Sequence, residues 1–209
     1  MDGGAVTLAN DFCFEGNEHA FWLNKAKGLS YKAEVGPDDD FQEMIKADEQ
    51  GAWLRNGGIQ NPMVEKARAG LAMYRFIATG AFQRYGKGAI HGDWWITDND
   101  FYTLKIFAEK HGHALSYAAS MLLAIPPNWG DCAHFGRVRL VQTLRAWTGH
   151  GKPASSKLTP DHSREDRRKA GASLRIPLRH LEIKQWFIPG GRSILAPIMP
   201  LETEIMAAR

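Results

Sequence analysis

Residues 92–98 read Gly92-Asp93-Trp94-Trp95-Ile96-Thr97-Asp98 and join a predicted strand to a predicted helix. The apolar run after the glycine is typical of a short strand, and Thr97 or Asp98 can then cap a helix. The helix is predicted to end at Gly112, a residue type that favours helix C-termini. Its apolar side is formed by Phe101, Leu104, Phe107 and Ala108. A strand that leads directly into an amphipathic helix favours a mixed fold.

Segments on both sides of this stretch extend the same pattern. Tyr74-Arg75-Phe76-Ile77 is rich in β-forming residues, and Leu174–Ile188 and Ser193–Ile198 are predicted as strands separated by Pro189-Gly190-Gly191. A second helix near Leu115–Ile125 precedes Pro126-Pro127, which stops it. The prediction is an α+β fold, with a helical middle section packed on a small, mostly antiparallel sheet drawn from residues 73–78, 91–96 and 174–198.

Three further segments are predicted as helices. Residues 41–45 follow a run of acids, and residues 61–71 begin with Asn-Pro and carry one apolar face. Residues 131–148 are also predicted as a helix, although the alternation over 137–145 is equally typical of a strand.

Charge is distributed unevenly along the 209 residues. Residues 1–60 hold eleven acids and five bases, a net charge of −6, whereas residues 137–192 hold thirteen bases and four acids, a net charge of +9. We therefore divide the chain into an acidic N-terminal region, 1–60, and a main α+β domain, 61–209, with a basic loop at 151–173. A basic surface of this kind favours an anionic partner: a nucleic acid, a nucleotide, or an acidic protein surface such as residues 38–49 of the same chain.

Several classes of protein are disfavoured. Cys13 and Cys132 are far apart, which argues against a disulfide scaffold and favours a reducing compartment. The first residues lack the pattern of a signal peptide, and no apolar run approaches the roughly 20 residues that cross a bilayer. These features predict a cytoplasmic protein without a membrane partner, and they leave its oligomeric state open.

Three short motifs contain the candidate functional residues. They are Met73-Tyr74-Arg75-Phe76, the turn Gly92-Asp93-Trp94-Trp95, and His180-Leu181-Glu182-Ile183, which runs on to Pro189-Gly190. In the last of these, Leu181, Ile183 and Phe187 alternate onto one face, so Glu182 is expected on the other with Lys184. In this order of an Arg strand, a middle motif and a late Glu strand, the chain resembles the mono-ADP-ribosyltransferase family.

The resemblance implies that NAD is the substrate and that ADP-ribose passes to an acceptor that the sequence does not identify. It implies that Glu182 stabilises the oxocarbenium-like cation and that Arg75 holds the dinucleotide by its pyrophosphate or ribose. Tyr74, Trp94 and Trp95 would complete the NAD site, with Trp94 or Trp95 against the nicotinamide ring.

The chain departs from the family pattern at two points. Asp93-Trp94-Trp95 stands where the family has Ser-Thr-Ser, and His180 stands two residues before Glu182, where a Gln or Glu is usual. Glu202-Thr203-Glu204 has the literal Glu-x-Glu spacing, so Glu204 is an alternative catalytic residue. A purely structural interpretation also stays open, with Arg75 on a surface strand, Trp94-Trp95 in the core and Glu182 paired with Lys184.

The alternative function is a non-catalytic nucleic-acid-binding module. Lysine and arginine neutralise phosphates, and Trp147, Trp186 and Phe187 lie among them in sequence, where they could stack on unpaired bases. The residues predicted to bind are Arg137, Arg139, Arg145, Lys152, Arg167, Arg168, Lys169, Arg175 and Arg179.

A metal site is not predicted. His111-x-His113 and Cys132-x-His134 have ligand types that suit zinc, but the two histidines flank the predicted helix stop at Gly112.

Overall fold

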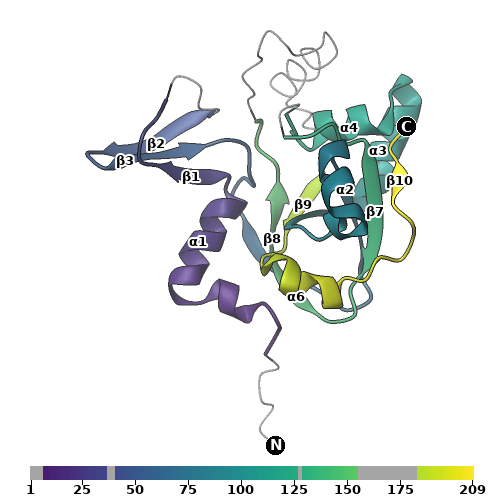
Figure 1. Cartoon of the computed structure of the whole chain (residues 1–209), viewed down its shortest axis with the longest axis horizontal. Coiled ribbons are helices and arrows are strands. Elements are labelled where there is room, and N and C mark those ends of the chain that lie inside the picture. The colour runs from purple at the N-terminus through teal and green to yellow at the C-terminus, as the bar shows by residue number, and fades with distance from the viewer. Residues whose placement is uncertain (1–6, 37–40, 127–128, 155–182) are drawn as a thin grey trace, which may run out of the picture.

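The computed structural model describes residues 7–36, 41–126, 129–154 and 183–209. It is an α+β fold with two antiparallel sheets, as predicted (Figure 1). The larger sheet has seven strands in the order β10-β7-β5-β6-β9-β8-β4, and the smaller has three in the order β1-β3-β2. The larger sheet therefore draws on more of the chain than the sequence suggested.

Strands β5 (Ala72–Ile77) and β6 (Trp94–Thr97) confirm the two strands predicted in the middle of the chain. Strand β5 pairs with β7 (His134–Arg139) along its whole length, and β6 pairs with β9 (Lys184–Phe187). Strand β9 also pairs with β8 (Leu144–His150), which in turn pairs with β4 (Met63–Ala67). The opposite edge is β10 (Met206–Ala207).

Helices cover both faces of this sheet. On one face, buried residues of β5, β6 and β7 pack against η2 (Gly86–Ile90) and α6 (Gly191–Ile198). On the other, α3 (Asp98–His111) and α4 (Leu115–Leu122) pack against Tyr74, Phe76 and Phe135. The short helix α2 (Thr79–Tyr85) follows β5 directly. Successive side chains of a strand point to opposite faces of the sheet. Because these strands carry apolar side chains on both faces, both faces need such a cover.

Helix α3 confirms its prediction closely. Thr97 precedes it, Asp98 and Asp100 lie in its first turn, and Gly112 ends it in the left-handed conformation with φ 63°. Acids near the N-terminus suit the helix dipole. Phe101, Leu104 and Ala108 are buried, as the spacing predicted.

The N-terminal region contributes the three-stranded sheet and one long helix. The sheet consists of β1 (Leu29–Lys32), β3 (Gly51–Arg55) and β2 (Glu43–Asp48), and Figure 1 shows it beside the main body. After the short η1 (Asp11–Phe14), helix α1 (Gly16–Ala26) packs through Trp22 and Ala26 against Trp147 and Phe187 of the larger sheet. The division at residue 60 stays a prediction.

Two of the predicted N-terminal helices are strands. Residues 41–45 lie mostly in β2, and residues 63–67 form the edge strand β4. Strand β4 pairs with β8 about 80 residues further along the chain, as at Val64↔Trp147. On an edge strand Met63 and Val64 stay exposed while Ala67 is buried, so the helix-like spacing did not mark a buried helix face.

Two later predictions are also wrong. Residues 131–148 are not a helix but lie mostly in strands β7 and β8. The strand alternative over 137–145 is confirmed only in part, because residues 140–143 connect the two strands. Phe135 and Val138 are buried in the clusters on opposite faces of the sheet, as in a strand that is covered on both sides. Residues 193–198, predicted as a strand, lie in α6, which buries Leu195 and Ile198 one helical turn apart. Of the predicted strand 174–188, residues 184–187 form β9 and residues 174–182 lie outside the described part of the chain.

Candidate functional site

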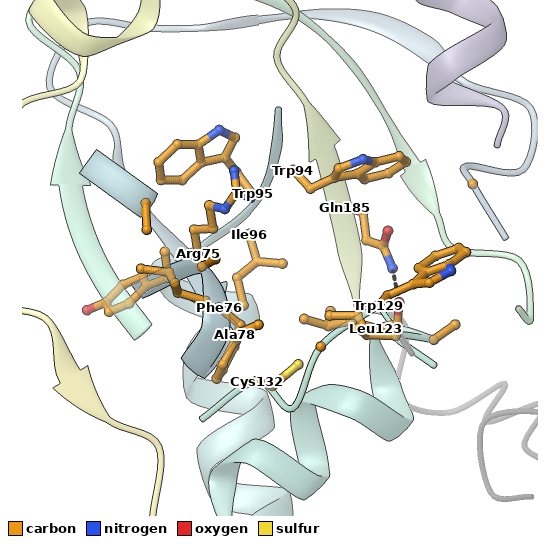
Figure 2. Close-up of a pocket in the computed structure, with 18 of the residues that line it drawn as sticks. Arg75, Phe76, Ala78, Trp94, Trp95, Ile96, Leu123, Trp129, Cys132 and Gln185 are labelled. Atoms are coloured by element: carbon orange, nitrogen blue, oxygen red, sulfur yellow. Dashed lines mark hydrogen bonds between the residues drawn. The ribbon is translucent and has the colours of Figure 1, made fainter. Parts of the chain in front are cut away.

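A pocket of about 280 Å³ opens where β5 and β6 separate. The two strands pair at Met73↔Thr97 and Tyr74↔Ile96 but not beyond Tyr74, whereas the other edge of β5 pairs with β7 along its whole length. Residues 123–125, 129, 130 and 132, which follow α4, form the facing wall. Figure 2 shows the side chains that line the pocket. They include Tyr74, Arg75, Phe76, Trp94, Trp95, Ile96, Leu123, Trp129, Cys132, Lys152 and Gln185.

All four residues that the resemblance assigned to NAD binding therefore line one pocket. Tyr74 and Arg75 come from β5, and Trp94 and Trp95 come from β6. The neighbouring positions of these two strands in the sheet bring them together.

Aromatic side chains of the pocket are held by other rings. Tyr74 stacks on Phe101 with ring centroids 4.0 Å apart, and Trp94 meets Phe187 edge-on at 5.0 Å. Trp129 is 48% exposed, and Figure 2 shows it on the same side of the pocket as Trp94. Rings fixed in this way can receive a planar group without first losing much conformational freedom.

Arg75 is the most unusual side chain of the pocket. Its side chain runs toward Trp95 (Figure 2), and its guanidinium packs so closely against Gly92 that a Cβ there would lie 1.3 Å from Nη1. Among the described residues, Nη1 is buried without a hydrogen-bond partner. Burial lowers the pKa of Arg75, and the nearby charge of Asp93 partly counters this effect. A buried guanidinium with an unsatisfied donor is costly, so a ligand that accepts a hydrogen bond from it would stabilise this arrangement.

The turn before β6 shapes this end of the pocket. The Gly92 carbonyl accepts a hydrogen bond of 2.7 Å from Trp95 Nε1, and the Asp93 carbonyl accepts one of 2.7 Å from the Ile188 amide. Burial raises the pKa of Asp93, while Lys25 and Arg75 oppose that rise. The sequence analysis named Asp93 as part of this turn but gave it no role.

Gln185 is a pocket residue that the sequence analysis missed. It is 8% exposed, and its Nε2 donates to the Leu123 carbonyl at 3.1 Å. Figure 2 marks this bond, which ties β9 to the segment that follows α4. No local motif points to Gln185, because the contact joins residues 62 positions apart.

The facing wall is fixed by Asp131. Its carboxylate accepts hydrogen bonds from the Thr79 amide at 2.9 Å, the Thr79 hydroxyl at 2.6 Å and the Ala133 amide at 3.2 Å. Burial alone would raise the pKa of Asp131, but these hydrogen bonds outweigh it and lower the pKa. The wall is thus attached to the first turn of α2.

Of the two candidate catalytic glutamates, Glu204 is among the described residues and Glu182 is not. Glu182 lies outside the described residues, and the chain resumes at Ile183, one residue before β9 begins. The amide of Lys184 donates to Asp100 Oδ1 at 3.1 Å, which anchors the start of β9 to helix α3. Glu204 is exposed and pairs with Lys87 at 2.6 Å, and neither residue lines the pocket.

The described part of the basic band is largely ion-paired. Arg137 and Arg139 both contact Glu202, and Arg137 also lies 3.4 Å from Asp98. Arg145 pairs at 3.0 Å with Asp11 of the acidic N-terminal region. Lys152 lines the pocket. The other predicted nucleic-acid-binding residues lie outside the described ranges: Arg167, Arg168, Lys169, Arg175 and Arg179.

The histidines that were considered as zinc ligands pack against aromatic rings. His111 and His113 pack against Phe107, and His134 packs against Phe82 with centroids 4.7 Å apart. Within the described ranges, no group of three or more His, Cys, Asp or Glu side chains is placed to hold a metal ion. Nor does any helix in that part of the chain have the length and apolar character needed to cross a membrane.

The chain matches no family model and no curated protein. The structure of Tne2 in complex with Tni2 is similar to 72% of this chain and 94% of the matched chain, with 14% sequence identity and a TM-score of 0.41.

Proposed function

We propose that this protein binds NAD in the pocket between β5 and β6 and cleaves the nicotinamide–ribose bond, with transfer of ADP-ribose to an acceptor. The observation that carries the proposal is that Tyr74, Arg75, Trp94 and Trp95 line one pocket. This supports a shared role for residues that the resemblance had connected only by their order in the sequence.

The side chains of the pocket suit both the nicotinamide ring and the sugar–phosphate part of NAD. The wall contributed by Trp94 and Trp129 offers flat apolar surfaces for the nicotinamide ring, and Arg75 offers a buried cation to the anionic or hydroxyl-bearing part of the ligand. The carboxylate of the reaction is assigned to Glu182 by the resemblance to the mono-ADP-ribosyltransferase family.

In the proposed step the C–N bond between ribose and nicotinamide breaks, and nicotinamide leaves with the bonding electron pair. Positive charge develops on the ribose, where the Glu182 carboxylate stabilises it. The acceptor then forms a bond to the same carbon and loses its proton.

The test compares two glutamates. Nicotinamide release from NAD is measured for the protein and for Glu182→Gln and Glu204→Gln, with circular dichroism to check the fold. We expect Glu182→Gln to lose activity by about a hundredfold or more, a typical effect of removing transition-state charge stabilisation. Glu204→Gln should retain activity. Full activity in folded Glu182→Gln would contradict the proposed role of Glu182.

The nucleic-acid alternative has no comparable support, because Arg137, Arg139 and Arg145 already pair with acids of the same chain. It predicts affinity for short oligonucleotides that falls steeply with ionic strength. Such binding, together with no response to NAD, would favour it over the enzyme.

A further inference from the structure

Lys152 lies two residues after β8 in a backbone that is held from two sides. Its amide donates to the Gly58 carbonyl at 2.7 Å, and the preceding Gly151 forms an antiparallel bridge with Ile59. A Cβ at Gly151 would lie 2.5 Å from Nε2 of Gln185, so the chain passes directly against a pocket residue. Lys152 is therefore presented to the pocket by a fixed backbone.

Charge in the pocket has one sign. Among the lining residues of the described chain, the charged side chains are Arg75 and Lys152. Within those same residues the Lys152 side chain has no acidic partner, whereas Arg137, Arg139 and Arg145 each have one. Two cations in a largely apolar lining favour an anionic ligand.

The backbones that carry the two cations are separated across the sheet. Arg75 is on β5 and Lys152 follows β8, and the sheet order β5-β6-β9-β8 separates these strands by three spacings. At about 4.8 Å per spacing, this is roughly 14 Å. A ligand that meets both cations is elongated and carries its anionic group at a distance from the part that lies beside Arg75.

We propose that Lys152 is a phosphate-binding residue of this pocket and holds the diphosphate of the dinucleotide, while the ribose hydroxyl groups lie toward Arg75 and the nicotinamide ring toward Trp94. This inference rests on the proposed function, since it divides one NAD site between two cations. It also moves Lys152 from the predicted nucleic-acid band to a small-molecule site. A lysine ammonium is a compact charge well suited to a phosphate.

The experiment is a calorimetric titration of the full chain and of Lys152→Gln with three ligands: NAD, inorganic diphosphate and nicotinamide riboside, which has no phosphate. Arg139→Gln is the matched control, because it removes a cation that is paired with Glu202. We expect Lys152→Gln to weaken NAD and diphosphate about tenfold, as loss of one charged hydrogen bond would. Riboside affinity should not change, and Arg139→Gln should behave like the unaltered protein.

The outcomes separate the two proposals. Equal NAD affinity in Lys152→Gln and the unaltered protein overturns the role of Lys152 and leaves NAD cleavage in place. An equal loss in Arg139→Gln also overturns it, since the effect would then be general electrostatics. Diphosphate binding that depends on Lys152 in a protein that neither binds nor cleaves NAD supports the phosphate site and refutes the proposed enzyme.

Discussion

The cations of the pocket and the cations of strand β7 have opposite surroundings. Arg137 and Arg139 of β7 share the carboxylate of Glu202, and Arg137 also lies near Asp98. In the pocket, Arg75 has a buried nitrogen without a hydrogen-bond partner among the described residues, and Lys152 has no acidic partner there. A count of basic residues in the sequence cannot make this distinction, because the balancing acids come from distant parts of the chain.

This difference indicates which positive charge is available to a ligand. Ion pairs between exposed side chains contribute little to stability, typically about 0–1 kcal/mol, but they do reduce the charge presented to a partner. A buried cation with an unsatisfied hydrogen-bond donor is costly and is typical of a functional site. The pocket, and not the β7 surface, is therefore the place to look for an anion.

The largest effect is expected from filling the space beside Arg75. Gly92→Ala places a Cβ against the Arg75 guanidinium and should displace it, which would weaken NAD binding by about a hundredfold, as loss of a charged contact would. Gly80→Ala is the control, because no atom lies within 4 Å of a Cβ there. Equal NAD affinity of the two variants, measured by calorimetry, would show that Arg75 has no part in binding.

A smaller effect is expected from removing one aromatic wall. Trp94→Leu should weaken NAD binding about tenfold, because stacking of a base on an aromatic side chain contributes about 1–3 kcal/mol. Trp53, which packs against Tyr31 in the three-stranded sheet, provides the comparison. If Trp53→Leu reduced NAD affinity as much as Trp94→Leu, the effect would not belong to the pocket.

On the β7 side, the expected effect is on stability and not on NAD. Glu202→Gln removes the carboxylate that Arg137 and Arg139 share, and should lower the free energy of unfolding by about 1 kcal/mol. Urea denaturation measures this change, and NAD affinity should stay the same. A large loss of NAD affinity would contradict the separation of the two regions.

The smallest effect concerns the pH dependence of stability near β9. Burial alone would raise the pKa of Glu65, but hydrogen bonds from Lys184 and Thr148 outweigh it and lower the pKa. A lowered pKa contributes stability above the usual carboxyl range, and this contribution is lost as the pH falls through the folded-state value. Glu65→Gln should be slightly less stable at neutral pH, with a difference that disappears in acid. Thermal melts between pH 7 and pH 3 would contradict this if the two proteins stayed parallel.

Local signals were sufficient for the middle of the fold. Helix α3 has a cap, a regular apolar spacing and a terminal glycine, so its sequence specifies both ends. Strands β4, β7 and β8 were predicted as helices because their apolar spacing suits either structure. Pairing such as Met63↔Thr148, between residues 85 positions apart, decides between them, and a single sequence does not show it.

The candidate site likewise combines residues that local sequence signals predicted with residues that they missed. Tyr74, Arg75, Trp94 and Trp95 were selected because they lie in short strand motifs, and the neighbouring positions of β5 and β6 bring them together. Trp129 and Gln185 were missed because they reach the pocket through a loop and a strand far away in sequence. Lys152 was assigned to a different surface because its charge was visible in the sequence and its neighbours were not.

The most direct measurement is calorimetric titration of the purified protein with NAD, repeated with Arg75→Ala and Arg139→Ala. The account predicts saturable binding that is weakened about a hundredfold by Arg75→Ala and unchanged by Arg139→Ala. Absence of NAD binding to the unaltered protein, or equal affinities for all three proteins, would contradict the claim that the pocket between β5 and β6 is an NAD site.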